Sequence, residues 1–277
     1  MGPIAKDSDR LFCLEGKVAI VTGGAGQLGA AYTAELAGRG AKVAVFDVVS
    51  PRQTDLTIAN SVAEGQVLPI VVDITDSSAV ADATEQVVRT LGVPHILINN
   101  AGLDSPPDAP SEENGPFETY PESSFDRVMD VNVKGTMLCC QAVGGRMATA
   151  GRGSIINISS VYGILSPVQD IYEYRRQRDE IFYKPVAYSV SKSAVMNLTR
   201  YLATYWAKAG VRVNTLTLSG IFNHQPPEFL EAYCSRIPLG RMMNVDEIIG
   251  PMIFLASDAS SYVTGSNLVV DGGWTAW

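Results

Sequence analysis

Basic residues are scarce in this chain. It has 21 lysines and arginines against 29 aspartates and glutamates in 277 residues, which gives a formal net charge of −8. Proteins that bind nucleic acids or anionic membranes need a basic surface, so neither kind of partner is expected. The longest apolar runs, such as 18–21 and 96–98, are too short to cross a bilayer. We also expect no signal peptide, and therefore a cytoplasmic protein.

Residues that bind metals or form disulfides are also few. The sequence has two histidines, His95 and His224, so a histidine-ligated metal site is not expected. None of its four cysteines forms a Cys-x-x-Cys pair. This usage is typical of reduced, intracellular cysteines rather than of a disulfide framework.

Apolar residues, in contrast, make up 46% of the chain and charged residues 18%, so the chain is expected to fold around a core. Strands are expected at 17–22, 42–47, 67–73, 95–99, 154–159, 212–218 and 267–270. Helices are expected between them, at 27–39, 77–91, 124–148, 187–208 and 245–256. This alternation predicts an α/β fold: one doubly wound domain over 1–277, with about seven parallel strands and helices on both faces.

Two long segments do not fit the alternation. One covers 103–122 and is rich in Pro, Glu, Asp and Ser; the other covers 165–185 and holds tyrosines, arginines and acidic residues. Loops of this length are uncommon in α/β domains and are usually functional or disordered. Both follow the carboxyl ends of expected strands, the edge where open parallel sheets bind ligands.

A glycine-rich turn follows the first expected strand. It reads Thr22-Gly23-Gly24-Ala25-Gly26-Gln27-Leu28-Gly29 and leads into a helix. Glycines let the backbone approach a pyrophosphate, and the helix N-terminus supplies amide donors. Asp47, at the end of the second strand, could bind the ribose 2′-hydroxyl of NAD and would repel the 2′-phosphate of NADP. The combination predicts an NAD site; a tight turn without a nucleotide is the alternative.

A tyrosine and a lysine stand four positions apart at the start of a long helix. In Tyr188-Ser189-Val190-Ser191-Lys192, the first and last residues share one helix face. Tyrosine is a poor base at neutral pH, but a nearby ammonium group favours the phenolate. The pair is therefore a candidate acid–base device, although the same spacing also occurs as an ordinary surface pair.

Five motifs occur in a fixed order along the chain: the glycine turn, Asn99-Asn100-Ala101-Gly102, Asn132-x-x-Gly135, Ile158-Ser159-Ser160 and Tyr188-x-x-x-Lys192. Together they resemble the short-chain dehydrogenase/reductase family, over about residues 14–274. Each motif alone is modest, but five in order are specific. The resemblance implies a seven-stranded Rossmann fold and NAD-dependent hydride transfer between nicotinamide and a secondary alcohol or ketone.

The resemblance also implies residue roles. Tyr188 would exchange the proton with the substrate, and Ser160 would bind the substrate oxygen. Lys192 would lower the pKa of Tyr188 and hold the nicotinamide ribose. Asn132 would support a water that connects Lys192 to solvent, or would merely bridge backbone groups. The implied cofactor-binding residues are Gly23, Gly26, Gln27, Leu28, Gly29, Asp47, Val48, Asp73, Ile74, Asn100, Ala101, Gly102, Tyr188, Lys192, Gly220 and Phe222. Ser159 could replace Ser160 in the cleft, and Asp73 could simply cap a strand end.

The chain departs from the family pattern in three places. Gln27 stands where the commonest glycine turn has a glycine. After the sixth strand, Ser219 and His224 occupy the positions of a proline and a threonine that usually lie near the nicotinamide. Ser160 and Tyr188 are also farther apart than is usual, which indicates an insertion within 165–185.

The insertion has three possible uses. Arg175, Arg176 and Arg178 could bind a phosphate or carboxylate of the substrate. Alternatively, the segment is a solvated turn whose four basic and four acidic residues cancel, or its aromatic residues form a subunit contact. The insertion resembles that of a subgroup of the family whose enzymes belong to bacterial sugar-modification and nonulosonic-acid pathways. This resemblance implies a sugar substrate, often phosphorylated or nucleotide-linked in that subgroup.

Other functions remain open at this point. A 3-oxoacyl or steroid-type reductase would keep the fold and cofactor, and a dinucleotide-binding sensor would keep only the binding site. In the family, the long helices corresponding to 124–148 and 187–208 pair between subunits. The resemblance therefore implies a homotetramer, with a dimer as the second possibility.

Overall fold

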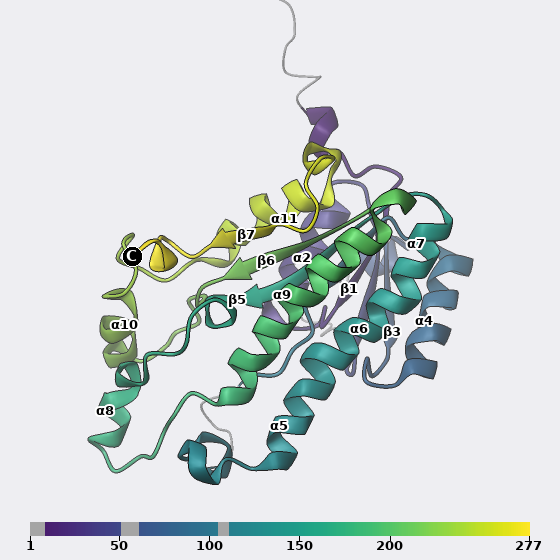
Figure 1. The fold of residues 1–277 in the computed structure, drawn as a ribbon. Helices are drawn as coiled ribbons and strands as arrows, with labels where there is room; N and C mark the ends of the chain where they lie inside the picture. The colour runs from purple at the N-terminus through teal and green to yellow at the C-terminus, as the bar shows by residue number, and fades with distance from the viewer. Residues whose placement is uncertain (1–8, 51–60, 105–110) are drawn as a thin grey trace, which may run out of the picture.

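The computed structural model describes residues 9–50, 61–104 and 111–277. Its centre is a parallel sheet with the strand order β3-β2-β1-β4-β5-β6-β7 (Figure 1). The strands are β1 (Val18–Thr22), β2 (Lys42–Asp47), β3 (Val67–Val71), β4 (Ile96–Asn99), β5 (Gly153–Ser160), β6 (Val211–Leu218) and β7 (Asn267–Val270). The prediction of a doubly wound sheet of seven parallel strands is confirmed. The order reverses between β1 and β4, and such switch points are where open sheets bind ligands.

Helices lie on both faces of this sheet (Figure 1). They are α2 (Gln27–Gly38), α4 (Ser77–Thr90), α5 (Glu122–Met129), α6 (Thr136–Cys139), α7 (Gly145–Thr149), α8 (Glu173–Arg176), α9 (Val186–Trp206), α10 (Pro227–Cys234) and α11 (Ile249–Ala256). Helix α10 was not expected from the sequence. Its signal is the Pro226-Pro227 pair, because proline is favoured in the first turn of a helix.

The helix expected at 124–148 is not uniformly α-helical. Helices α5, α6 and α7 follow one another along one rod, separated by π-helical stretches at Asp130–Gly135 and Cys140–Gly144 (Figure 1). A π-helical turn inserts an extra residue and rotates the side chains that follow. The apolar pattern of the sequence does not distinguish π-helical from α-helical turns here, because both make their backbone hydrogen bonds within the segment.

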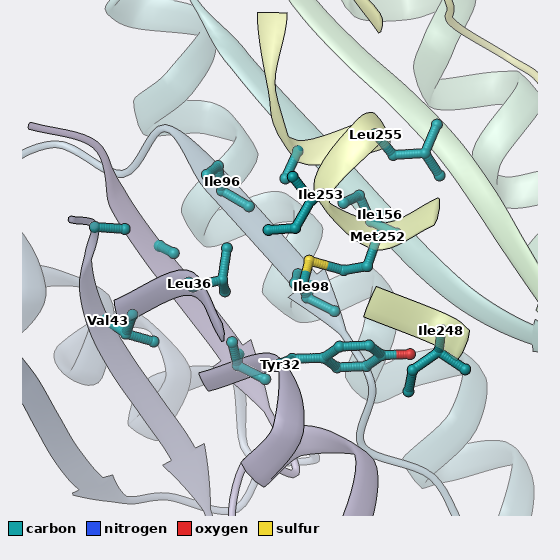
Figure 2. Close-up of a cluster of buried hydrophobic side chains, with 14 of the residues drawn as sticks. Tyr32, Leu36, Val43, Ile96, Ile98, Ile156, Ile248, Met252, Ile253 and Leu255 are labelled. Carbon is teal, nitrogen blue, oxygen red and sulfur yellow. The ribbon is translucent and has the colours of Figure 1, made fainter. Parts of the chain in front are cut away.

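Two apolar clusters hold the helices against the sheet. Strand β1 shows why, since Ala19 and Val21 point to one face and Ile20 to the other, following the two-residue period of a strand. The first face packs against α2 and α11, where Tyr32 and Met252 are buried (Figure 2). The second face packs against α4, α9 and the rod of α5 to α7. With both faces covered, polar chemistry is confined to the strand ends.

Local capping fixes where two helices begin. Asp76 accepts hydrogen bonds from the amides of Ser78 and Ala79, which starts α4. Asn244 and Glu247 form a capping box ahead of α11. Neither α4 nor α11, nor any other helix in the described ranges, is long and apolar enough to cross a membrane.

A third apolar cluster joins the insertion to the C-terminal part of the chain. It contains Tyr172 and Phe182 of the insertion, whose ring centroids lie 4.6 Å apart, together with Tyr233 of α10 and Trp274. The Trp274 ring lies edge-on to Tyr233, at 4.5 Å between centroids. The two buried aromatic residues of the insertion therefore pack within the chain. The segment 165–185 is therefore in part a folded wall, while its residues 177–181 form an exposed turn.

Trp274→Ala should destabilise the protein by about 3–5 kcal/mol, because it empties the centre of this third cluster. Trp277→Ala is the matched control: Trp277 is 78% exposed, and its replacement should change stability by less than about 0.5 kcal/mol. Urea unfolding followed by circular dichroism measures both. Equal effects would show that Trp274 is not a packing centre.

Candidate active site

A cleft of about 340 Å³ lies at the carboxyl ends of β4, β5 and β6. It is lined by the Asn100–Gly102 segment after β4, by Ser160 at the end of β5, by the first turns of α9 and by Gly220 after β6. Segments widely separated in the sequence thus meet at one edge of the sheet. This is the location that the doubly wound topology predicts for a ligand site.

Three glycines of the turn, Gly23, Gly24 and Gly29, have no room for a side chain. A Cβ on Gly29 would lie 2.2 Å from the carbonyl oxygen of Gly23, and a Cβ on Gly23 would lie 2.8 Å from the Cα of Ala101. Gly26 is the N-cap of α2 and gives it no side-chain cap. The first amides of α2 can therefore donate to a phosphate, as the sequence predicts.

The carboxylate of Asp47 lies beside this turn. Its Oδ2 atom accepts a hydrogen bond of 2.9 Å from the amide of Ala25, and its Oδ1 atom accepts one of 3.2 Å from Val49. The neighbouring side chain of Val48 is 64% exposed. A carboxylate held at the end of β2, next to the glycine turn, is placed to bind the ribose hydroxyls of a dinucleotide.

Asn100 connects the glycine turn to β4. Its side-chain amide donates to the carbonyl oxygens of Thr22 and Gly23, at 3.1 Å each, and the hydroxyl of Thr22 accepts from the amides of Asn100 and Ala101. Gly102 then passes close to the catalytic helix, because a Cβ there would lie 3.4 Å from the Nζ atom of Lys192. The turn and the floor of the cleft form one hydrogen-bonded unit.

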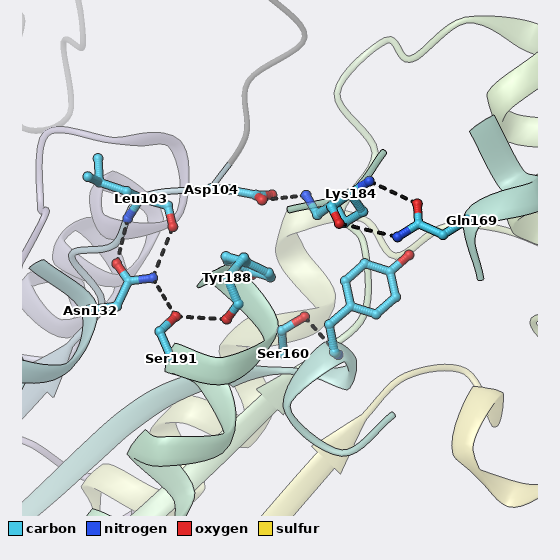
Figure 3. A network of polar contacts seen from close by, with 9 residues as sticks. Leu103, Asp104, Asn132, Ser160, Gln169, Lys184, Tyr188 and Ser191 are labelled. Carbon is cyan, nitrogen blue, oxygen red and sulfur yellow. Dashed lines mark hydrogen bonds and ion pairs between the residues drawn. The ribbon is translucent and has the colours of Figure 1, made fainter. Parts of the chain in front are cut away.

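Asn132 lies in the first π-helical stretch and is 1% exposed. Its Oδ1 atom accepts from the amide of Leu103 at 2.7 Å, and its Nδ2 atom donates to the carbonyl of Leu103 and to the hydroxyl of Ser191 (Figure 3). Ser191 in turn donates to the carbonyl of Tyr188 at 2.7 Å. Asn132 thus joins the floor of the cleft to α9, the backbone-bridging use that the sequence left open.

The two serines at the end of β5 have different partners. The Ser159 hydroxyl donates to the carbonyl of Lys192 at 2.9 Å and ties β5 to α9. The Ser160 hydroxyl accepts from the amide of Tyr162 at 3.2 Å and lies within reach of the phenol of Tyr188 (Figure 3). Ser160 is thus the serine that faces Tyr188.

Tyr188 and Lys192 share one face of α9, as their spacing predicts. The Nζ atom of Lys192 lies 5.7 Å from the centroid of the Tyr188 ring and donates to the carbonyl of Ile158 at 3.0 Å. Burial lowers the pKa of Lys192 to about 8, against an opposing effect of Asp104. Burial raises the pKa of the Tyr188 phenol, Asp104 raises it further, and Ser160 opposes the rise. The lowering of the Tyr188 pKa that was expected from Lys192 is thus not seen, because desolvation of the phenol dominates.

Of the remaining cofactor candidates, Gly220 lines the cleft, and Asp73, Ile74 and Phe222 lie outside its lining. Asp73 forms a turn in which its Oδ1 atom accepts from the amide and hydroxyl of Thr75, so it ends β3 earlier than expected. Ile74 is buried against Gly135. Gly220 donates its amide to the Tyr233 hydroxyl at 2.6 Å, and Phe222 is 39% exposed beside His224. His224 adopts a left-handed backbone conformation, with φ at 56°.

The three arginines of the insertion do not line the cleft. Arg175 pairs with Glu180 at 3.0 Å and stacks over Phe182, and Arg178 pairs with Glu228 of α10. Arg176 donates to the carbonyls of Phe182 and Gln169. Their guanidinium groups hold the insertion in shape, and the structure does not bring them to the residues around Tyr188.

Other residues reach the cleft instead. Asp104, Tyr172 and Lys184 of the two long segments line it, together with Tyr162 after β5 and Tyr233 of α10, and the sequence motifs do not point to any of them. Lys184 precedes Tyr188 by four positions, as Tyr188 precedes Lys192. Within a helix this spacing would place Lys184 on the same face as Tyr188. The spacing does not determine its place here, because α9 begins only after Pro185. In the described ranges, no group of three or more His, Cys, Asp or Glu side chains could hold a metal ion.

Comparisons with known proteins agree with this geometry. The family model described as enoyl-(acyl carrier protein) reductase matches residues 23–275. D-threitol dehydrogenase of Mycolicibacterium smegmatis is 34% identical over 95% of both chains. The chain belongs to the short-chain dehydrogenase/reductase family. This family member is therefore an NAD(P)-dependent oxidoreductase, and the prediction of its enzyme class is confirmed.

Two solved structures of the family bind different dinucleotides. A gluconate 5-dehydrogenase from Burkholderia cenocepacia, in complex with NADP and tartrate, superimposes with a TM-score of 0.83 at 28% identity, covering 98% of this chain and 99% of that one. A short-chain dehydrogenase from Leptospira borgpetersenii with bound NAD⁺ superimposes with a TM-score of 0.81 at 31% identity, covering 95% and 94%. The glycine cradle and uncapped α2 of this chain fit such a dinucleotide.

The lowered pKa of Lys192 has a consequence for stability. Between about pH 8 and the ordinary lysine pKa near 10.4, the unfolded chain binds a proton at this site that the folded chain has lost. The unfolding free energy of the wild type should therefore rise with pH in this range, relative to that of Lys192→Met. Urea unfolding of both proteins from pH 7 to pH 10 measures the difference. A difference that stays flat would show an ordinary pKa for Lys192.

Proposed function

We propose that the protein oxidises a secondary alcohol of a small polyhydroxylated substrate, a sugar or polyol, with NAD as the preferred cofactor. The observation that supports this most directly is the meeting of Ser160, Tyr188 and Lys192 in one cleft, beside a glycine turn shaped for a dinucleotide. These residues come from β5 and α9, and Asn132 fixes α9 to the cleft floor.

The proposed roles follow from the contacts. Tyr188 takes the proton of the substrate hydroxyl, and Ser160 holds that oxygen through a hydrogen bond. Lys192 stabilises the phenolate that forms and binds a ribose hydroxyl, and Asn132 positions α9 and Leu103 without touching the substrate. When bound, the nicotinamide supplies hydride acceptance. The other implied residues, including Gln27, Leu28, Asp73, Ile74, Gly220 and Phe222, are proposed to line the cofactor.

The polarity of the cleft supports a hydroxylated substrate. Three tyrosines, Tyr162, Tyr172 and Tyr233, and Gln225 line it together with the charged pair of Asp104 and Lys184. The names of the relatives, which include threitol and gluconate dehydrogenases, support the same class. The resemblance to enzymes of nonulosonic-acid pathways implies a phosphorylated or nucleotide-linked sugar, but the arginines that could bind its phosphate do not line the cleft. The proposal therefore omits the phosphate.

The preference for NAD rests on Asp47. Its carboxylate can accept a hydrogen bond from the ribose 2′-hydroxyl and would repel a 2′-phosphate at the same place. The amides of Ala25 and Val49 fix it there. Relatives bind either cofactor, so this residue, and not membership of the family, supports the choice.

We also propose a homotetramer, or failing that a dimer, in which α9 packs against a second copy. Tyr201 and Tyr205 stack on the outer face of α9 and are 63% and 67% exposed. Large aromatic side chains in such a position are typical of protein interfaces.

Tyr188→Phe should lower kcat by about 10²–10⁴-fold, because it removes the group that transfers the proton. The dissociation constant for NADH should change little. Activity with polyols is followed by NADH formation at 340 nm, and NADH binding by fluorescence. Tyr205→Phe, on the exposed face of the same helix, is the control and should keep wild-type activity. Normal turnover by Tyr188→Phe would exclude the proposed mechanism.

Asp47→Asn keeps one of the two oxygens that accept from the amides of Ala25 and Val49, and it removes the charge. The ratio of kcat/KM with NAD to kcat/KM with NADP should fall by about tenfold or more, as expected for loss of a charged hydrogen-bond partner. Initial rates with both cofactors measure this ratio. A wild type that uses NADP better than NAD would contradict the role of Asp47.

A further inference from the structure

Lys184 is a lysine of the insertion that is buried in the active-site cleft. Its side chain is 8% exposed. Its backbone is held at two points by one side chain: the amide donates to Oε1 of Gln169 at 2.9 Å, and the carbonyl accepts from Nε2 of Gln169 at 3.2 Å (Figure 3). The lysine is thus placed by a fixed piece of backbone and not by a free surface loop.

The ammonium group of Lys184 meets two partners above the catalytic tyrosine. Its Nζ atom lies 4.9 Å from the centroid of the Tyr188 ring and forms an ion pair with the carboxylate of Asp104, which follows β4 (Figure 3). A lysine buried this deeply without a counter-charge would be costly, so the pair is a condition for its position. The Asp104 side chain is 50% exposed and can still accept hydrogen bonds from a ligand.

The charges around the cleft leave no place for an anion. The charged residues that line it in the described ranges are Asp104, Lys184 and Lys192. Lys192 donates to the carbonyl of Ile158 and faces the proposed ribose site, so the substrate end holds one cation and one carboxylate that cancel. A neighbouring hollow of about 740 Å³ shares Tyr162 and Lys184 with the cleft, and its other charged lining residue is Glu118.

A substrate carboxylate or phosphate would therefore meet a cation that is already neutralised and a carboxylate that repels it. Hydroxyl groups face no such penalty. One substrate hydroxyl can donate to Asp104 while the neighbouring hydroxyl accepts from Lys184. Each charged group then gains a hydrogen bond, and the ion pair between them is kept.

We propose that Asp104 and Lys184 select an uncharged substrate with two neighbouring hydroxyl groups, one of them next to the carbon that is oxidised at Tyr188. This inference rests on the proposed function and specifies its substrate class: a neutral polyol or sugar, and not a sugar acid or a sugar phosphate. Asp104 and Lys184 are specificity-determining residues that touch the substrate, in addition to the residues that carry out proton transfer.

The first test compares neutral and anionic substrates of equal chain length on the wild-type enzyme. The pairs are threitol with threonate and arabinitol with arabinonate, each assayed by NADH formation. The polyol of at least one pair should have a kcat/KM about tenfold or more above that of its acid, as expected when a like charge opposes binding. A wild type that prefers the acids would overturn the inference and leave the dehydrogenase assignment intact. No turnover of any polyol or acid would contradict the proposed function itself.

The second test changes the charges one at a time. Asp104→Asn leaves Lys184 without its counter-charge, so the preference for polyol over acid should fall by about tenfold or more. Lys184→Met should lower kcat/KM for the polyol by about tenfold or more, mainly through KM, without raising it for the acid. NADH affinity should stay unchanged in both variants, because neither residue is proposed to touch the cofactor.

The matched controls are Lys17→Met and Asp258→Asn, which break an ion pair of 3.7 Å at the opposite edge of the sheet. Neither should alter the ratio of kcat/KM values. If Lys184→Met and Asp104→Asn lower the unfolding temperature but leave that ratio at its wild-type value, the pair only fastens the insertion to the segment after β4. That result would refute substrate selection by the pair.

Discussion

The covering of the sheet on both faces is the constraint on which the rest of the structure depends. Apolar clusters occupy each face, and polar side chains within the strands, such as Asn157 and Thr215, are buried and bonded to Thr199 of α9. The polar groups that line the cleft lie instead at the carboxyl edge, where Asn100 and Ser160 follow or end their strands. The register of β1 with β2 and β4 brings the glycine turn and the cleft floor together at this edge. The topology of the sheet, rather than any single residue, thus determines where the active site lies.

Buried polar groups in the cleft are satisfied through a short chain of hydrogen bonds. Asn132 links Leu103 to Ser191, Ser191 reaches the carbonyl of Tyr188, and Lys192 is held by the carbonyl of Ile158. Each unmade bond of this kind would cost about 1–3 kcal/mol, so the network fixes α9 against the floor. The phenol and the ammonium group are therefore oriented before any substrate arrives.

The sequence predicts the parts of the molecule that obey local rules. Every strand was expected within two residues of its observed ends, because buried parallel strands have near-continuous apolar runs. The glycine turn and the spacing of Tyr188 and Lys192 are equally local. The π-helical stretch at Asn132 and helix α10 were not predicted, since each covers eight residues or fewer, too few to define a period. The insertion was the least predictable, because its arginines contact a ring and carbonyls six or seven residues away, at spacings that no regular helix or strand period encodes.

The packing of Trp274 against Tyr233 and the insertion also bears on the order in which parts of the chain can fold. Residues 165–185 are translated long before Trp274, yet they share one apolar cluster with it. During synthesis β1, β2 and β4 are complete before the wall that carries Lys184, but the sheet face that packs against α2 is covered only once α11 has been made. The cofactor side and the substrate side therefore both depend on the last part of the chain. Discrimination between substrates becomes possible only when the C-terminal segment has docked.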